Sequence, residues 1–557
     1  MAGNGTTLAP IGGQPTTIEP EGDGPFNSDD AAWALGNSFL ILTMQTGFAM
    51  LECGCVSSKN MANIMIKNVC DVSIGGIAFW ALGYGLIFGN PSNWLCGYGD
   101  FFFTITDPDT LGERYTHYFF QFSFASTATT IVSGAIAERM KFPAYMVFSF
   151  VNIFIYCLPA YWCWGSKGFL ANLGFFDFAG VCCVHLNGGT SALVAALMLG
   201  PRTDRFKQPG KYDMNSPITA LTGMFMLTWA WLGFNCGSTF RMTPQYWKIA
   251  GLVSVTTLNG AIGGGLAGLG LSLIWKRGKV DIGFTINSVL GGLVAITGGC
   301  PVYSPAESLA IGAIGAAIAI GTGELLERFK IDDPVGAVPV HFGAAVWGTI
   351  AVGIFGQNNF LDMLSYNGLF HHGGGKMLGV NALGALVTAA FSATSTFLVF
   401  LLMKHTIGIR VSLEEEAVGA DFMEHDIRPQ AVHDKLDHLI KALEKNSKPG
   451  DKQNVNEALQ QIMESERLND SEGKVGPLAI PYNKSAKSSS MAVLARMAAE
   501  RDIENRNKDT IIMRLKAQVN KTTKSATKIS DVAKKEIGTN PDRSFFQKTN
   551  EHLPRLF

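Results

Sequence analysis

The chain has 557 residues, 47% of them hydrophobic and 16% charged, with a mean hydropathy of +0.19. Its 44 basic and 45 acidic residues nearly balance, which excludes the basic excess typical of nucleic-acid-binding proteins. The polar N-terminal stretch has no basic segment leading into a short apolar core, so we expect no cleavable signal peptide. The long apolar segments that follow it indicate a polytopic membrane protein.

Apolar windows of about 20 residues, each long enough to cross a bilayer as a helix, follow one another from residue 33 to residue 405. They predict an all-α fold with about eleven transmembrane helices. We place these helices near residues 33–53, 63–88, 115–137, 143–164, 178–199, 217–238, 247–274, 282–300, 305–326, 337–356 and 377–403.

Basic residues gather in alternate loops between these helices, as at Arg139 and Lys141, in segment 202–211 and in segment 276–279. By the positive-inside rule these loops are cytoplasmic, which places the N-terminus outside and the C-terminus inside. In that orientation Asn4 heads an accessible glycosylation sequon.

The ten cysteines all lie between Cys53 and Cys300 without the paired spacing of a zinc site, and most are expected to be small core residues. Cys96, in a predicted loop, is the one obvious disulfide candidate, and the sequence does not identify its partner. Glycines cluster inside predicted helices at 260–270 and 312–321. They predict close helix packing, although membrane helices are also rich in glycine generally.

The pattern D-x-x-G-x-x-x-V-H occurs twice, from Asp177 to His185 and from Asp333 to His341. The first copy belongs to the fifth predicted helix and the second to the tenth, so the two run in opposite directions through the bilayer. Asp177 then lies at the outer mouth and Asp333 at the inner one. This is the signature of an inverted-topology repeat, whose functional groups meet near the midplane. Eight residues of helix place each histidine about 12 Å from its aspartate, where the two imidazoles can meet.

Three interpretations of the two histidines are open from the residues alone. Each imidazole can form a hydrogen bond to a neighbouring helix, with no substrate near it. The pair can bind a metal together with Cys182, which lies three residues before His185 on the same helix face. We favour the third, in which two neutral imidazoles share a proton and bond a small polar solute, with no metal and no cofactor.

Aromatic residues are dense at 119–127, 161–168 and 229–239. Ring faces attract cations by about 0.5 to 2 kcal/mol, so these segments can hold a small cation before it reaches the histidines. The alternative for most of these rings is an aromatic belt at the membrane interface.

Six stretches together resemble the ammonium transporter family: GFAMLECGCVSSKN (47–60), TIVSGAIAER (130–139), DFAGVCCVHLNGGTSALVAALMLG (177–200), WLGFNCGS (231–238), DDPVGAVPVHFGAAVWG (332–348) and GIRVSLEEEAVGADFMEHD (408–426). The resemblance is to the Amt branch of the Amt/MEP/Rh superfamily. It implies a multi-pass protein of the plasma membrane that forms a homotrimer. Each protomer is implied to have its own pore and eleven helices, arranged as an inverted 5+5 repeat plus one extra helix. The implied substrate is ammonium or ammonia, and the implied partners are copies of the chain itself and membrane lipids.

The resemblance also carries roles onto residues of the outer half of the pore. Phe124, Trp164 and Ser238 resemble the family's external ammonium site, two rings and a hydroxyl around the cation. Asp177 resembles the aspartate that supports this site by orienting backbone amides. Phe124 and Phe234 resemble a stacked phenyl gate beneath it.

Further residues are carried onto the pore itself. His185 and His341 resemble the twin-histidine pair, and Trp231 and Gln121 match other positions near the pore. Glu52, at the inner end of the first helix, is a buried carboxylate candidate. It can pair with Lys59, help a proton leave at the cytoplasmic side, or be an acid at a helix end without a function.

The implied activity is transport and not enzymatic catalysis. Ammonium is recruited at the outer site and loses a proton, and ammonia crosses the pore while the proton moves separately. One alternative is an Rh-type channel for neutral ammonia or carbon dioxide, and another is an ammonium sensor that signals through its tail. Trp164 and Ser238 favour the Amt branch, because Rh-type proteins usually lack both.

Four regions are expected along the chain: an extracellular segment at 1–30, a transmembrane ammonium transporter domain at 31–407, a cytoplasmic regulatory segment at 408–427 and a cytoplasmic tail at 428–557. The tail is charged and poor in aromatic residues, and short runs of helical spacing interrupt it. We therefore expect it to be partly helical and partly disordered. A cytoplasmic partner of the tail is expected, and the sequence does not identify it.

Overall fold

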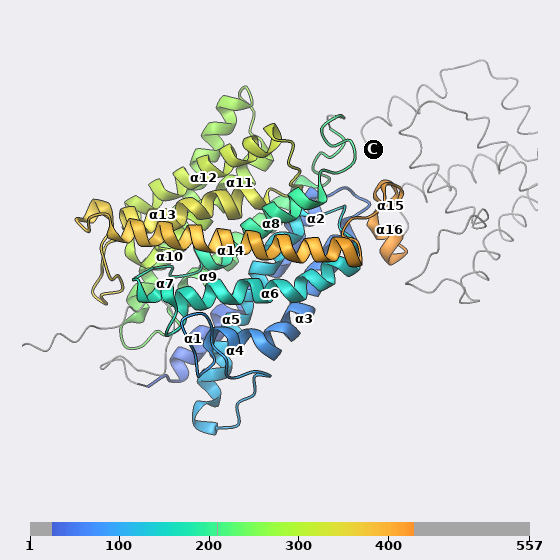
Figure 1. Ribbon diagram of the computed structural model, residues 1–557. Helices are drawn as coiled ribbons and strands as arrows, with labels where there is room; N and C mark the ends of the chain where they lie inside the picture. The colour runs from blue at the N-terminus through green and yellow to red at the C-terminus, as the bar shows by residue number, and fades with distance from the viewer. Residues whose placement is uncertain (1–24, 209, 428–557) are drawn as a thin grey trace, which may run out of the picture. The chain divides into compact units, whose positions relative to one another are not determined.

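The computed structural model describes residues 25–208 and 210–427 (Figure 1). These residues belong to two compact units, divided between Val411 and Ser412. The predicted sequon at Asn4, most of the predicted segment 1–30 and the whole predicted tail 428–557 lie outside the described residues.

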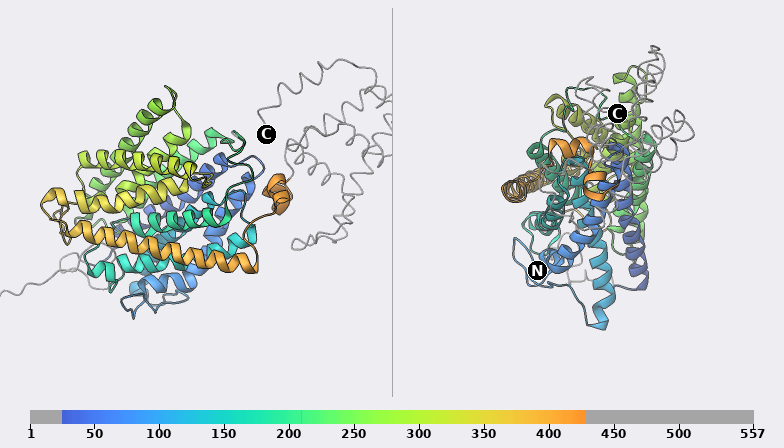
Figure 2. Two further views of the ribbon diagram at one scale, coloured as in Figure 1. Left: turned by 45° about the horizontal axis from the view of Figure 1, so that its top comes forward. Right: turned by 90° about the vertical axis from the view of Figure 1, so that its right-hand side faces the viewer.

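Membrane-length helical segments follow one another through the first unit and run roughly alongside each other (Figure 1; Figure 2). They are α1 and α2 (Ser28–Leu42, Met44–Cys55), α3, η1 and α4 (Met61–Ala78, Phe79–Gly83, Tyr84–Phe88), α5 (Pro108–Ala135), α6 (Phe142–Trp164), η2 and α8 (Val181–Leu186, Asn187–Leu199), α9 (Pro217–Gly237), α10 (Tyr246–Trp275), α11 (Ile282–Thr297), α12 (Pro305–Arg328), η4 and α13 (Pro339–Gly343, Ala344–Phe355) and α14 (Lys376–Thr406). Short helices between them are α7 (Phe169–Asn172), η3 (Cys300–Val302) and η5 (Leu369–His371), and the second unit contains α15 (Leu413–Val418) and α16 (Ala420–His425).

This helix order confirms the predicted all-α membrane fold. In the described part of the chain, 8 segments are long and apolar enough to cross a membrane, and Ile282–Thr297 and Pro339–Phe355 are shorter apolar helices. The remaining predicted span is α5, which has 28 residues and buries many serines and threonines. Those hydroxyls lower its hydropathy, and they are satisfied inside the protein, where several bond to carbonyls one turn earlier in α5.

Local side-chain chemistry sets where several helices begin. A side-chain oxygen just before the helix accepts a hydrogen bond from an amide of the first turn, which stabilises a helix by about 1 kcal/mol. The capping residues are Asn27, Asp107, Ser216, Asp281 and Ser304. Proline follows three of these caps, where its missing N–H costs no helical hydrogen bond.

The two helices that carry the histidines begin later than the sequence pattern predicts. Gly180 and Gly336 have φ angles of 91° and 83°, a left-handed conformation that residues other than glycine rarely adopt. The helical turns η2 and η4 follow these glycines, so segment 177–180 is a turn. The expected 12 Å rise from aspartate to histidine along a continuous helix is therefore wrong, because glycine breaks the helix halfway.

Glycines bring α10, α11 and α12 into close contact. A Cβ on Gly312 would lie 2.1 Å from the carbonyl oxygen of Gly260, and a Cβ on Gly263 would lie 2.1 Å from a carbonyl oxygen of α12. These contacts confirm the predicted close packing, since no larger residue fits. A Cβ on Gly270 or Gly321 would meet no neighbouring atom of the described residues within 4 Å. Close packing does not explain these two glycines, which fit the general abundance of glycine in membrane helices.

The last long helix, α14, lies along one side of the bundle, where it contacts α13, α8 and α6 (orange in Figure 1). Only 28% of its most apolar stretch is buried, so most of this helix is available to lipid. It follows the ten spans of the predicted 5+5 repeat as the extra helix.

A buried ion cluster joins three loops at one end of the bundle. Arg202 donates to both oxygens of Asp332, at 2.8 and 3.0 Å, and also to Glu138. The three side chains are between 1% and 3% exposed. Burial alone would raise the pKa of Asp332, but the hydrogen bonds and charge of Arg202 outweigh it and lower this pKa to about 2.

The change Arg202→Ala is expected to lower the free energy of unfolding by about 3 to 5 kcal/mol, because it removes the main partner of two buried carboxylates. Lys207→Ala is the control, since Lys207 is 82% exposed where it pairs with Asp204 at 3.3 Å, and it should cost less than about 1 kcal/mol. Denaturant unfolding of the detergent-solubilised protein measures both. Equal losses would contradict the role assigned to the cluster.

The same cluster predicts a pH dependence. A carboxyl group whose pKa is lowered on folding stabilises the protein fully above its unfolded value, about 3.9 for aspartate, and loses this effect as the pH falls through the folded value. The difference in stability between the parent and Arg202→Ala should therefore shrink between about pH 4 and pH 2. A constant difference across this range would argue against the Arg202–Asp332 pair as its source.

Candidate functional site

The structure brings the two histidines of the repeat together. His185 on η2 and His341 on η4 have their Nδ1 atoms 3.2 Å apart and their ring centroids 5.2 Å apart. They are 0% and 3% exposed. At this distance one imidazole donates and the other accepts, so the pair holds a single proton between its facing nitrogens. The other nitrogen of His185, Nε2, is buried without a hydrogen-bond partner among the described residues and can bond a solute.

Asp177 holds the start of η2 in place. Its Oδ1 accepts hydrogen bonds from the amides of Gly180 and Val181 at 2.9 and 2.8 Å, and its Oδ2 accepts from Cys182 and Cys183 at 2.8 and 3.2 Å. These four amides are the ones that the first turn of a helix leaves without partners. Asp177 is 1% exposed, so its carboxyl group lies inside the protein at the start of the helix that carries His185.

A series of stacked rings continues from His185 in one direction. Trp231 stacks on His185 at 4.9 Å between centroids, and its Nε1 donates to Thr297 at 2.8 Å. Phe234, one turn along α9, lies 5.5 Å from His185. Phe234 in turn stacks on Phe124 at 4.0 Å with an angle of 12° between the rings. This phenyl stack closes the way to the histidines from that side.

An aromatic pocket lies beyond the phenyl stack. Its lining residues are Phe120, Gln121, Phe124, Trp164, Phe178, Ser238 and Phe240. The structure thus gathers four of the predicted site residues, from α5, α6 and the end of α9, around one space. Trp164 meets Phe124 edge to face at 6.1 Å, and its Nε1 donates to the Asp177 carbonyl at 2.8 Å. We call this space the aromatic pocket.

Three lining residues of the aromatic pocket were not predicted from the sequence. Phe120 lies one turn before Phe124 on α5, Phe178 directly follows Asp177, and Phe240 comes just after α9. The dense aromatic stretch 119–127 was a usable signal for Phe120. Phe178 and Phe240 lie in irregular segments, where sequence spacing does not predict the direction of a side chain.

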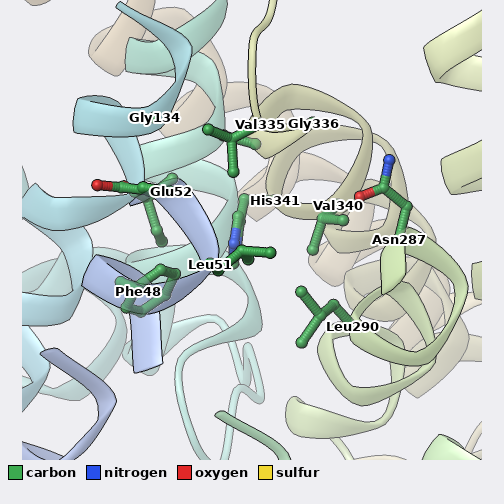
Figure 3. Close-up of a pocket in the computed structure, with 12 residues that line it drawn as sticks. Phe48, Leu51, Glu52, Gly134, Asn287, Leu290, Val335, Gly336, Val340 and His341 are labelled. Carbon is green, nitrogen blue, oxygen red and sulfur yellow. The ribbon is translucent and has the colours of Figure 1, made fainter. Parts of the chain in front are cut away.

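On the other side of the histidines lies a second cavity, which we call the Glu52 cavity (Figure 3). Its lining residues are Phe48, Leu51, Glu52, Ile131, Gly134, Asn287, Leu290, Val335, Gly336, Ala337, Val340 and His341. Phe48 lies 5.9 Å from His341 between ring centroids. The imidazole pair therefore separates two cavities, one lined mainly by rings and one that contains a carboxyl group.

Glu52 is 1% exposed near the end of α2. Its carboxylate accepts hydrogen bonds from Asn68 at 2.7 Å and from Ser133 at 2.5 Å. The pairing with Lys59 that the sequence left open is not among these bonds, because Glu52 turns toward α3 and α5.

The metal interpretation of the histidines receives no support from the described residues. Cys182 Sγ lies 3.4 Å from Thr388 Oγ1, and no group of three or more His, Cys, Asp or Glu side chains in the described ranges could hold a metal ion. Cys96, the disulfide candidate, is a free thiol.

Taken together, the side chains connect the two cavities by continuous ring contacts from Trp164 through Phe124, Phe234 and His185 to His341. Rings at the first end can attract a cation. The imidazoles can donate and accept hydrogen bonds and can exchange protons. The arrangement can therefore bind a small cation and pass a neutral, hydrogen-bonding solute onward.

Comparison with known proteins agrees with this geometry. The sequence model described as the Ammonium Transporter Family matches residues 32–428. A relative from Caenorhabditis elegans is 40% identical over 425 residues, which cover 74% of this chain and 62% of that relative. The ammonium transporter Amt2 of Archaeoglobus fulgidus is 37% identical over 441 residues, which cover 75% of this chain and 92% of Amt2.

A solved structure described as a sensor Amt protein has a similar fold. It is 34% identical with a TM-score of 0.65, and the match covers 71% of this chain and 98% of that one. The family match spans most of the chain and includes all the helices around the two cavities. The chain therefore belongs to the ammonium transporter family.

Proposed function

We propose that this protein transports ammonium by separating it into ammonia and a proton. Ammonium binds in the aromatic pocket between Trp164, Phe124 and Ser238, loses a proton, and crosses as ammonia past His185 and His341. The proton crosses separately, along the imidazole pair. The observation that carries the proposal is the continuous series of rings that joins the two cavities through the histidines.

The energetic reason for separating the proton is the cost of an unhydrated charge. The idealised cost of moving an ion of this size from water to an apolar interior is about 20 kcal/mol. A neutral polar molecule costs about 2 to 7 kcal/mol, and less when it keeps a hydrogen bond. The unpartnered Nε2 of His185 supplies such a bond. Ammonia can therefore pass a constriction that excludes ammonium.

The aromatic pocket supports recognition of the cation before this step. The faces of Trp164 and Phe124 attract a positive charge through the ring quadrupole. Ser238 donates its own proton to the carbonyl of Phe234 at 2.9 Å, which leaves the lone pairs of its hydroxyl oxygen to accept from a solute N–H. Asp177 adds negative charge next to the pocket. Potassium is attracted equally well, but it has no proton to lose and is rejected at the phenyl stack.

The same pocket separates this proposal from an Rh-type channel for neutral gas. A channel for ammonia or carbon dioxide has no need of a cation site, because a neutral solute gains little from ring faces. Here Trp164 and Ser238 both line the pocket. Their presence supports a transporter that recruits the charged form.

A second candidate function is an ammonium sensor. The observation that favours it is the similarity to a solved protein described as a sensor Amt protein. A sensor of this kind would bind ammonium in the aromatic pocket, carry little or no flux and signal through the segment after residue 427. Flux measurements distinguish it from a transporter.

We also propose an oligomeric state and a membrane orientation for the chain. It forms a homotrimer in the plasma membrane, with the N-terminus outside and the C-terminus in the cytoplasm. The transporter domain is 31–407, and the segment 408–427, which contains α15 and α16, is regulatory. The segments 1–30 and 428–557 are extracellular and cytoplasmic respectively, and the latter binds a cytoplasmic partner. The basic loops and the family match to residue 428 support this arrangement.

Selectivity between ammonium and potassium tests the proposed function. An ammonium concentration jump across proteoliposomes that contain the parent protein should move charge, and an equal potassium jump should not, because only ammonium can lose a proton. Internal pH is recorded in the same vesicles. Potassium charge movement comparable to that of ammonium would defeat the proposal. Rapid internal alkalinisation without charge movement would favour the neutral channel, and ammonium binding without either signal would favour the sensor.

The cation-binding role of the aromatic pocket can be tested at Trp164. Trp164→Leu removes one cation–ring contact and should raise the half-saturating ammonium concentration about 2- to 30-fold, the equivalent of about 0.5 to 2 kcal/mol. The maximal rate should change less. Trp162→Leu is the matched control, because Trp162 lies on the same helix but packs on Phe169 and Phe391, away from the pocket. Equal effects of the two changes would mean that the ring acts through packing alone.

A further inference from the structure

The Glu52 cavity is the counterpart of the aromatic pocket under the inverted repeat. Phe234 and Ser238 lie one turn apart at the end of α9 and line the aromatic pocket or its phenyl stack. Five spans earlier, Phe48 and Glu52 have the same four-residue spacing on α2 and line the Glu52 cavity. Phe234 lies 5.5 Å from His185, and Phe48 lies 5.9 Å from His341.

A second pair of helices repeats the correspondence. Gln121 and Phe124 on α5 line the aromatic pocket, and Asn287 and Leu290, with the same three-residue spacing on α11, line the Glu52 cavity. The helices α5 and α11 are again five spans apart. An amide side chain thus occupies the same position in both cavities.

Each cavity also lies beside one capping aspartate. Asp333 accepts hydrogen bonds from the amides of Gly336 and Val338 at 3.1 and 2.7 Å, as Asp177 does for η2. Each cavity is therefore lined by an amide and lies near a capping carboxylate, and the repeat relates these groups. His341 lines the Glu52 cavity directly, whereas His185 lies behind the phenyl stack of the aromatic pocket.

The differences between the two cavities are as informative as the similarities. Leu290 stands where the aromatic pocket has Phe124, so the Glu52 cavity has no stacked phenyl pair to close it toward the histidine. Glu52 stands where the aromatic pocket has the hydroxyl of Ser238. In place of rings, this cavity therefore offers a cation a carboxyl group, whose oxygens can accept hydrogen bonds from its N–H groups.

We propose that the Glu52 cavity is a second ammonium-binding site, in which the Glu52 carboxylate binds the cation on the far side of the histidines from the aromatic pocket. This inference rests on the proposed function. It assigns an ammonium site to the side of the protein opposite the aromatic pocket. In the transport direction from the aromatic pocket, ammonia regains its proton here and is held as ammonium before release. In the reverse direction the site recruits ammonium.

The surroundings of Glu52 leave the carboxylate able to bind a cation. Figure 3 shows Glu52 and Asn287 on opposite walls of the cavity, with His341 between them. Ser133 and Asn68 donate one hydrogen bond each to the two carboxylate oxygens. A carboxylate has about four acceptor positions, so further positions remain. Gly134 lines the wall beside Glu52, where a Cβ would lie 3.3 Å from Glu52 Oε1, and its lack of a side chain keeps this wall open.

The test compares the two faces of the membrane. Initial rates of ammonium uptake are measured in vesicles of each orientation, with ammonium presented either at the Glu52 face or at the aromatic-pocket face. Glu52→Gln keeps the size of the side chain, removes the acid and replaces one acceptor oxygen by an NH2 donor. It should raise the half-saturating concentration about tenfold or more at the Glu52 face, the range expected for a hydrogen bond to a charged group. At the aromatic-pocket face the value should stay within about twofold, below the effect of one such bond.

Two further variants make the result specific. Glu52→Asp keeps the acid and should restore part of the affinity at the Glu52 face, which a purely structural role would not require. Glu327→Gln removes an exposed carboxylate on α12 that pairs with Arg205 outside the cavity, and should leave both faces unchanged. An unchanged value for Glu52→Gln at the Glu52 face would overturn the inference. So would equal losses at both faces with lowered thermal stability, because Glu52 would then only tie α2 to α3 and α5.

Failure of transport itself is a separate outcome. If the parent protein carries no ammonium flux, the proposed function fails. Binding in the Glu52 cavity is then tested by measuring how much ammonium chloride raises the thermal stability of the solubilised protein. A smaller stabilisation in Glu52→Gln than in the parent supports the site, and identical stabilisation overturns it.

Discussion

The cost of placing a charge in an apolar interior is the constraint on which the rest of this structure depends. Between the aromatic pocket and the Glu52 cavity, the side chains that meet are phenyl, indole and imidazole rings, none of which carries a permanent charge. Carboxyl groups stand on either side, at Asp177 and Glu52, and both accept hydrogen bonds inside the protein. Such a path lets a neutral solute that forms hydrogen bonds, such as ammonia, pass and excludes a charged one. The proposed transport cycle follows from this difference.

The repeat explains how one chain builds this path. Each half supplies an aspartate, a left-handed glycine and a short helical turn that contains a histidine, and the antiparallel arrangement turns the two imidazoles toward each other. The aspartates satisfy amides that the helix starts would otherwise leave unpaired inside the protein. The same positions have diverged between the halves, since Ser238 corresponds to Glu52 and Phe124 to Leu290. Such divergence makes the two faces chemically different although the backbone repeats.

Much of the fold and part of the candidate site could be predicted from the sequence, for identifiable reasons. Span positions follow from hydropathy, because a bilayer demands about 20 apolar residues in a row. The pairing of His185 with His341 followed from an identical nine-residue pattern in opposite orientations. The late helix starts were missed because a glycine turn inside an apolar run leaves no mark on hydropathy. The Glu52 cavity was missed as a site because its other walls carry neutral residues, and because Ser133, a bonding partner of Glu52, is 81 residues away along the chain.

The central claim is that charge crosses this protein only through the imidazole pair. The most direct test is ammonium-driven charge movement in proteoliposomes that contain the double variant His185→Leu/His341→Leu, measured beside the parent. The account predicts that the double variant still binds ammonium, seen as thermal stabilisation by ammonium, and moves no charge. Charge movement at the level of the parent in this variant would contradict the account, because ammonium would then cross without the histidines.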